Sequence, residues 1–189
     1  MPGKVNPVIA ESVLMVSAQV IGKNTNEFFR VARVTLDRAA RDIGPNLPVL
    51  ASDGVVGTTL RSSGDTVDVR LVVDAGSGVD VVVQRTGARG FVRGTGDETK
   101  YSVEVQYVQS ADEVEVGDLL VTSGVGRRFP KGIPVATVTE VVKRDFGIYQ
   151  RVLASPAVDF SRLEEVMIVT SPPTDEPSAP KPASSAPNR

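Results

Sequence analysis

The stretch Gly117–Val141, GDLLVTSGVGRRFPKGIPVATVTEV, is the most informative part of the chain. It contains two short runs of apolar and β-branched residues, Leu119–Val121 and Ile133–Val138, which are typical of strands. Glycine, serine and proline residues separate the two runs. They predict a tight, irregular connection, because glycine permits positive φ and proline fixes φ. We therefore expect a strand, a corner and a second strand, with no obvious catalytic group among them.

Similar short runs continue on both sides of this corner, about one every ten residues, with turn residues between them. The expected strands are Phe28–Leu36, Val55–Thr59, Val67–Val73, Val79–Gln84, Gly90–Val92, Tyr101–Val108, Leu119–Val121, Ile133–Val142, Ile148–Leu153 and Val166–Thr170. Asp42–Pro48 is expected to be a loop, since it contains two prolines and a glycine. No segment between the strands has a helical period. The pattern predicts an all-β fold of short antiparallel strands, as in a sandwich or barrel.

The two ends of the chain differ from this pattern. Asn6 and Pro7 suit the N-cap and first turn of a helix, and apolar residues follow them at spacings of three and four. Residues 1–22 are therefore expected to form one short α-helix, a helical leader. Residues 171–189 are rich in proline and contain no large apolar side chain, so we expect a disordered tail.

Composition excludes several classes of function. The 189 residues include 21 basic and 23 acidic side chains, which gives no electrostatic argument for binding nucleic acid. Histidine and cysteine are both absent. Their absence removes the commonest general base and zinc ligand together with thiolate chemistry, so we expect no catalytic residue, metal or cofactor. No apolar run is long enough to span a membrane, and the N-terminus lacks the features of a signal peptide.

Three local patterns suggest chemistry, and each has a simpler interpretation. Gly87–Gly96 is glycine-rich but lacks the lysine of a phosphate-binding loop, which favours a hairpin. Ser123 and Lys131 could form the nucleophile and base of a β-barrel hydrolase, but no nucleophile-elbow motif surrounds the serine. The acidic residues of Asp112–Asp118 could bind calcium, but they lack EF-hand spacing and are more simply a solvated loop.

The first residues also carry a family resemblance of their own. The sequence MPGKVNP resembles the signature loop of class II fumarases and related lyases. The resemblance implies that Lys4 and Asn6 correspond to substrate-site residues of that family. It covers a small part of the chain, and the serine that precedes the signature is missing. A fumarase-type fragment is thus an alternative interpretation, and a leader without lyase activity is the simpler one.

Five further motifs, in order along the chain, resemble the MreC family of rod-shape-determining proteins. They are VIG at Val20–Gly22 followed by Phe29–Asp37, VLASDGVVG at Val49–Gly57, RTGARGFVRG at Arg85–Gly94, GDLLVTSGVGRRFPKGIPVATV at Gly117–Val138 and SPAVDFSRLEEVMIV at Ser155–Val169. The resemblance runs from about residue 18 to residue 169. It implies a non-enzymatic scaffold of the cell-elongation machinery, the elongasome, which organises peptidoglycan synthesis.

The same resemblance implies two small β-barrel lobes on the periplasmic side of the inner membrane. We expect a first lobe at residues 23–75, which C-terminal strands could complete, and a second lobe at residues 76–170. The leader at residues 1–22 would stand where the family has a coiled coil, and we expect the membrane anchor to lie outside this chain. The partners implied are a second copy, as a dimer or filament, MreD, a class B penicillin-binding transpeptidase and RodA, with MreB reached indirectly.

The corner supplies the candidate partner-binding residues. They are Arg127, Arg128, Phe129 and Lys131. The large ring of Phe129 is either tucked under the loop or presented to a partner, and we favour the tucked arrangement. We also expect open strand edges to add strands from neighbouring molecules, because unpaired backbone groups favour such pairing.

Overall fold

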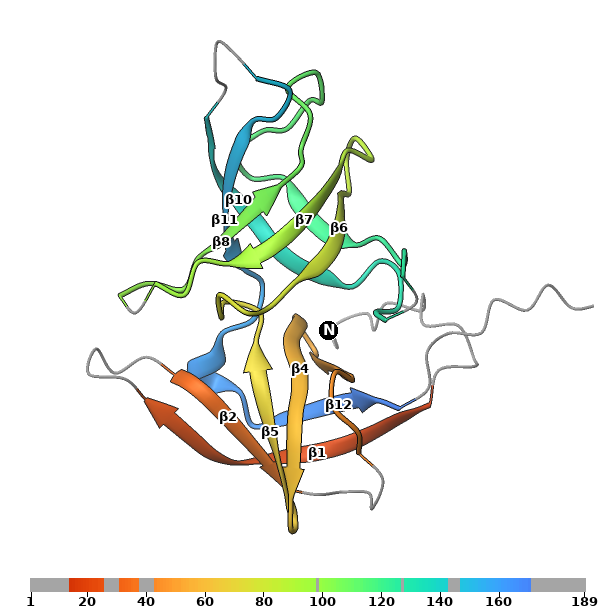
Figure 1. Ribbon diagram of the computed structural model, residues 1–189, viewed down its shortest axis with the longest axis vertical. Helices are drawn as coiled ribbons and strands as arrows, with labels where there is room; N and C mark the ends of the chain where they lie inside the picture. The colour runs from red at the N-terminus through yellow and green to blue at the C-terminus, as the bar shows by residue number, and fades with distance from the viewer. Residues whose placement is uncertain are drawn as a thin grey trace, which may run out of the picture.

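The computed structural model describes residues 14–25, 31–37, 43–97, 99–126, 128–142 and 147–170. Within these ranges twelve strands form two closed barrels of six strands each, and one 3₁₀ turn, η1 (Phe160–Arg162), is the helical element. Figure 1 shows the two barrels one above the other. The predicted all-β class with two barrel lobes is confirmed.

Neighbouring strands of each barrel are antiparallel. The first barrel, in the order β1-β12-β3-β4-β5-β2, contains β1 (Met15–Thr25), β2 (Val31–Asp37), β3 (Pro48–Ala51), β4 (Gly54–Ser63), β5 (Thr66–Leu71) and β12 (Glu165–Val169). The second, in the order β10-β11-β8-β7-β6-β9, contains β6 (Val79–Val83), β7 (Arg89–Gly94), β8 (Val103–Gln106), β9 (Leu119–Thr122), β10 (Pro134–Val142) and β11 (Arg151–Pro156).

Alternating side chains fill the barrels. Along β5, Val67, Val69 and Leu71 are buried, while the residues between them are half-buried. Successive side chains of a strand point to opposite faces, so this period of two places every second residue in the core. Valine dominates the buried set, as expected for β-branched side chains on a pleated surface. One continuous hydrophobic cluster extends through both barrels.

The chain crosses between the barrels twice, through residues 72–78 and again through residues 157–164 (Figure 1). The second crossing returns the chain to the first barrel, where β12 pairs with β1 and β3. The expected second lobe of residues 76–170 therefore ends too late, and the expected first lobe begins too late, since β1 starts at Met15. Long-range pairing decides both boundaries.

The helix expected in residues 1–22 is wrong from Met15 onward. Residues Met15–Gln19 pair with Val169–Glu165 of β12, which gives the backbone the partners that a helix would have found internally. Tertiary pairing here overrides the helical spacing of Val16 and Val20. Residues 1–13, including Lys4 and Asn6, and residues 171–189 lie outside the described part of the chain.

Two further expectations are corrected. The end of the loop expected at Asp42–Pro48 belongs to a strand, because β3 begins at Pro48 and fills the place between β12 and β4. Open strand edges were expected, but both sheets close on themselves among the described strands. A closed barrel leaves no free edge for strand addition. Contacts with other proteins must therefore involve side chains and loops.

Candidate functional site

The corner between β9 and β10 has the predicted strand, turn and strand. Pro134 and Ala136 of β10 pair with Val121 and Leu120 of β9. Buried Thr122 fixes the connection, because its hydroxyl donates to the carbonyl of Pro130 and accepts from the main-chain N–H of Ile133. Gly124, Gly126 and Gly132 have φ values of 76°, 81° and 84°, the left-handed region that glycine adopts without strain.

The four residues proposed for partner binding lie in different surroundings. Arg128 and Lys131 are exposed, whereas Phe129 is 6% exposed and belongs to the hydrophobic core. Its ring is thus tucked in, the arrangement that we favoured. Arg127 lies outside the described residues. Of the four, Arg128 and Lys131 offer side chains at the surface.

A pocket of about 450 Å³ lies beside the corner, at the waist between the barrels. Its walls come from the crossing at residues 75–78, from Asp80, Phe91 and Arg93 of β6 and β7, and from corner residues 124–126, 128 and 129. We call it the waist pocket. A smaller cavity next to it is lined by Phe129 and Arg128 together with Arg70 of β5. The smaller cavity thus has walls from the corner and from the first barrel.

Two arginines, one from each barrel, hold the first crossing in place. Arg70 of β5 donates from Nη1 to the carbonyl of Gly76 at 3.3 Å, and Arg93 of β7 donates from Nε to the carbonyl of Ala75 at 3.0 Å. Asp74 accepts from the N–H of Gly76 at 2.7 Å, which tightens the same turn. Arginines from different barrels thus bind the carbonyls of the adjacent residues Ala75 and Gly76.

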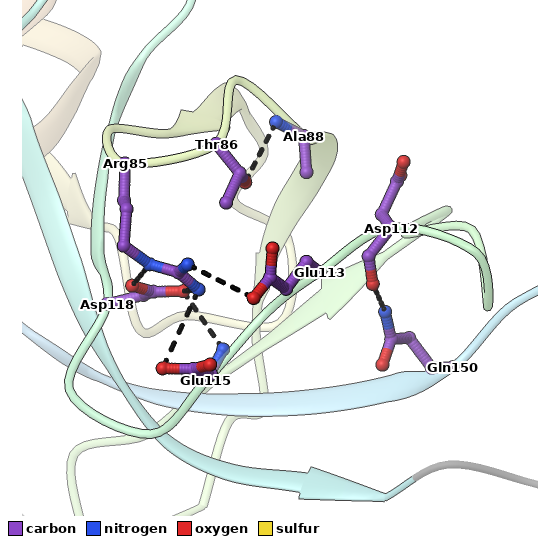
Figure 2. Close-up of polar contacts among 8 residues, drawn as sticks. All are labelled: Arg85, Thr86, Ala88, Asp112, Glu113, Glu115, Asp118 and Gln150. Carbon is purple, nitrogen blue, oxygen red and sulfur yellow. Dashed lines mark hydrogen bonds and ion pairs between the residues drawn. The ribbon is translucent and has the colours of Figure 1, made fainter.

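A second polar cluster surrounds Arg85 (Figure 2). Its guanidinium donates to both carboxylate oxygens of Asp118, at 2.8 and 3.1 Å, and forms longer ion pairs with Glu113 and Glu115. Asp118 also accepts from the N–H of Glu115 at 2.9 Å. Three of the acidic residues considered as calcium ligands therefore gather around an arginine. Because Arg85 is far from them in the sequence, local patterns could not predict this contact.

Electrostatics follow from this geometry. The hydrogen bond from Arg85 holds the pKa of the Asp118 carboxyl below its ordinary value, and the Glu115 N–H acts in the same direction. The same hydrogen bond raises the pKa of Arg85. Asp118 is buried, so its charge depends on this pairing. The cluster fastens the loop before β9 to the end of β6, a structural role.

The end of the second barrel carries an exposed aromatic group that sequence analysis missed. Tyr107 follows β8 and Tyr149 precedes β11, and their rings meet edge to face with centroids 5.8 Å apart. Tyr107 is 63% exposed and Ile148 is 73% exposed. Tyr107 has φ of 62°, which is unusual for a residue with a bulky side chain. We call Tyr107, Ile148 and Tyr149 the tip.

Backbone contacts support the tip from below. The N–H of Ser110 donates to the carbonyl of Ile148 at 2.7 Å, and Gln109 forms a β-bridge with Tyr149. Buried Gln150 donates from Nε2 to the carbonyl of Gln109 at 2.9 Å and to that of Asp112 at 2.8 Å, the second of which Figure 2 shows. The apolar side chains of the tip therefore stand on a fixed frame.

The alternative enzymatic sites gain no support from the geometry. The Ser123 hydroxyl accepts from the N–H of Val125 at 3.1 Å, and no hydrogen bond joins it to Lys131 in the described part of the chain. Among those residues, no three His, Cys, Asp or Glu side chains gather as a metal site. The described ranges also contain no helix long and apolar enough to cross a membrane.

The fold and these surfaces define a tandem β-barrel protein whose barrels share one core. Over residues 20–170 the sequence matches the family described as "MreC: Rod shape-determining protein MreC, barrel core". The chain belongs to this family, which is one of structural, shape-determining proteins. The resemblance stated from the five motifs is thus confirmed.

Individual relatives agree with this assignment. The chain is 34% identical over 122 residues to the cell shape-determining protein MreC of Haemophilus influenzae, covering 65% of this chain and 34% of the relative. A solved structure described as "MreC" is 33% identical, with a TM-score of 0.75, covering 84% of this chain and 88% of that chain. The crystal structure of MreC from Pseudomonas aeruginosa is also 33% identical, with a TM-score of 0.73, covering 82% and 99%.

A further structure shares the fold at lower identity. It is the complex between penicillin-binding protein PBP2 and MreC from Helicobacter pylori, at 16% identity and a TM-score of 0.64, covering 84% of this chain and 99% of that one. The curated relatives are longer proteins: the chain spans about a third of the MreC of Haemophilus influenzae (34%) and of Escherichia coli (33%), and about half of that of Listeria monocytogenes (52%).

Proposed function

We propose that this chain is the barrel part of a non-enzymatic scaffold in bacterial cell elongation, which maintains rod shape by organising peptidoglycan synthesis through protein contacts. Membership of the MreC family and the names of the curated relatives support this proposal. By the same resemblance the barrels lie on the periplasmic side of the inner membrane. They self-associate there, and they work with MreD and RodA and, indirectly, with MreB.

The observation that carries the proposal is the tip. Tyr107, Ile148 and Tyr149 present apolar surface to solvent at the end of the second barrel, although burying such groups in the protein would be favourable. Exposed aromatic clusters of this kind commonly mark protein contacts, and aromatic residues supply much of the energy in interfaces. A surface of this type supports a scaffold better than an enzyme.

We assign the tip to a class B penicillin-binding transpeptidase. An MreC from Helicobacter pylori is known in complex with the penicillin-binding protein PBP2. The two closed barrels leave no strand edge to pair among the described strands, so partners must bind through side chains and loops. The tip supplies apolar side chains for such a contact.

The test is the affinity of the purified chain for the elongation transpeptidase of its own organism, measured by isothermal titration calorimetry. We expect Ile148→Ser to weaken binding by about ten-fold or more, since it removes an apolar group from the interface. Ile21→Ser is the matched control, because Ile21 is 57% exposed on β1 of the other barrel and should leave the affinity unchanged.

Two results would overturn the proposal. One is the absence of binding by the unaltered chain, and the other is an equal loss for both isoleucine variants. Turnover in a fumarate hydration assay that depends on Lys4, or serine labelling by a fluorophosphonate that depends on Ser123, would instead favour an enzyme.

A further inference from the structure

The waist pocket has an unusual set of charges. Among the described residues, five arginines form ion pairs with carboxylates, namely Arg33, Arg61, Arg85, Arg151 and Arg162. The three arginines around the waist, Arg70, Arg93 and Arg128, form none within the same residues. Of the four described arginines without a carboxylate partner, three thus lie where the barrels meet, and the fourth, Arg89, lies elsewhere.

The two guanidiniums that line the pocket retain donors for a ligand. Arg93 uses its Nε to hold the Ala75 carbonyl, and its terminal N–H groups are in no described hydrogen bond. Arg128 is exposed, and its guanidinium has no described partner. A guanidinium has five N–H donors in a planar fork that matches a carboxylate. The pocket therefore offers anchoring points for carboxylates.

The remaining surfaces of the pocket are different in kind. Half-buried Phe91 lies against Gly78, where a Cβ would stand 2.4 Å from the ring, so the glycine keeps this wall open. Asp80 is the acidic group that lines the pocket, and its carboxylate accepts no described hydrogen bond. The pocket thus combines two guanidiniums, one carboxylate acceptor and the aromatic side chains of Phe91 and Phe129.

We propose that the waist pocket binds an extended, acidic peptide segment of a partner protein. Carboxylates of the segment pair with Arg93 and Arg128, a backbone N–H of the segment donates to Asp80, and an apolar side chain lies on Phe91. Charge complementarity selects this occupant. A compact phosphate or a nucleic acid would leave the ring of Phe91 unused, whereas an extended peptide can place its carboxylates at the arginines and turn a backbone N–H towards Asp80.

The probe is a short fluorescein-labelled peptide of alternating glutamate and leucine, titrated with the full chain and followed by fluorescence anisotropy. A peptide with glutamine in place of glutamate is the matched control. We expect saturable binding of the glutamate peptide, an affinity at least about ten-fold lower for the glutamine peptide, and a further loss as salt is raised.

Two variants locate the binding. Arg128→Glu should weaken it by about ten-fold or more. Arg89→Glu makes the same charge change at another exposed arginine without a described ion pair, away from the waist pocket, and should leave the affinity unchanged. Circular dichroism confirms that each variant folds. Equal binding of both peptides, or equal losses for both variants, would overturn the proposal.

Inorganic phosphate serves as the competing anion. Full displacement of the peptide by phosphate at low millimolar concentration would show a simple anion site and would refute the peptide assignment. The experiment contains no transpeptidase, and Ile148→Ser at the tip should not alter it. Failure of the peptide experiment would therefore leave the proposed function intact. Failure of the transpeptidase test at the tip would likewise leave the proposal for the waist pocket intact.

Discussion

Gly54, the first residue of β4, lies so close to Pro134, the first residue of β10, that a Cβ on the glycine would stand 2.3 Å from the proline carbonyl oxygen. The two strands belong to different barrels. Gly54 also has φ of 148°, which a residue with a side chain rarely adopts. The absence of a side chain at Gly54 thus allows β4 of the first barrel to approach β10 of the second barrel this closely.

Gly54→Ala should therefore lower the free energy of unfolding by more than about 2 kcal/mol, because overpacking against backbone adds to strain. Gly64→Ala is the control: its φ of 56° carries strain, but nothing lies within 4 Å of its Cβ position. We expect a loss of about 1–2 kcal/mol there. Urea denaturation measures both. Equal losses would show that the contact with Pro134 has no energetic consequence.

The Arg85–Asp118 pair predicts how stability depends on acid. The folded protein holds the pKa of Asp118 below its ordinary value, so the unfolded chain takes up the proton first as pH falls. The stabilisation is complete well above pH of about 4, the ordinary Asp value, and is lost as pH falls through the lower folded pKa. In the Asp118→Asn variant, the free energy of unfolding should decrease less steeply with falling pH over that acid range than it does in the unaltered chain.

A double-mutant cycle tests the same pair at neutral pH. Arg85→Gln should lower the free energy of unfolding more than Asp118→Asn does, because it leaves buried Asp118 with only the Glu115 N–H among its described donors, whereas exposed Arg85 keeps its ion pairs with Glu113 and Glu115. The double variant should cost less than the sum of the two. Strict additivity in urea denaturation would contradict the coupling between Arg85 and Asp118.

Local patterns predicted much of this fold, and they failed where distant strands decide the structure. The corner at Gly117–Val141 is correct because its glycines, prolines and β-branched runs act over a few residues. The expected helix fails from Met15, since the partner of β1 is β12, at the other end of the chain. Spacing along residues 1–22 carries no information about that partner.

The tip shows the same limit within one strand. The expected strand Tyr101–Val108 places Val103, Val105 and Tyr107 on one face by its period of two. The first two are buried, but the positive φ at Tyr107 breaks the alternation, so its ring is exposed and Val108 is buried instead. A tyrosine gives no warning of positive φ, so the sequence offered no signal for this surface.

Gln150 connects the tip to the barrel, and its loss should loosen the loop at residues 109–112. Gln150→Met keeps the side-chain length but leaves the carbonyls of Gln109 and Asp112 without the donor that buried Gln150 supplies. We expect a loss of about 1–3 kcal/mol and faster amide exchange in that loop. Gln84→Met, at an exposed glutamine, should change neither quantity. Unchanged exchange in the Gln150 variant would show that other contacts hold the loop.

Tyr107 should reverse the usual order of glycine and alanine. Its positive φ costs a residue with a side chain about 1–2 kcal/mol, and glycine removes that cost. Both Tyr107→Gly and Tyr107→Ala lose the ring contact with Tyr149, which contributes about 0.5–1.5 kcal/mol. We therefore expect the free energy of unfolding of Tyr107→Gly to exceed that of Tyr107→Ala by about 1 kcal/mol. It should also lie within about 1 kcal/mol of the value for the unaltered chain.

Binding separates this effect from stability. Both Tyr107 variants lose the exposed ring, so both should bind the transpeptidase about ten-fold more weakly or worse, whatever their stability. A Tyr107→Gly chain that folds as well as the original but no longer binds would show that the strained backbone is retained to present the ring. If that chain bound normally, or proved less stable than Tyr107→Ala, the positive φ would have no role in the contact.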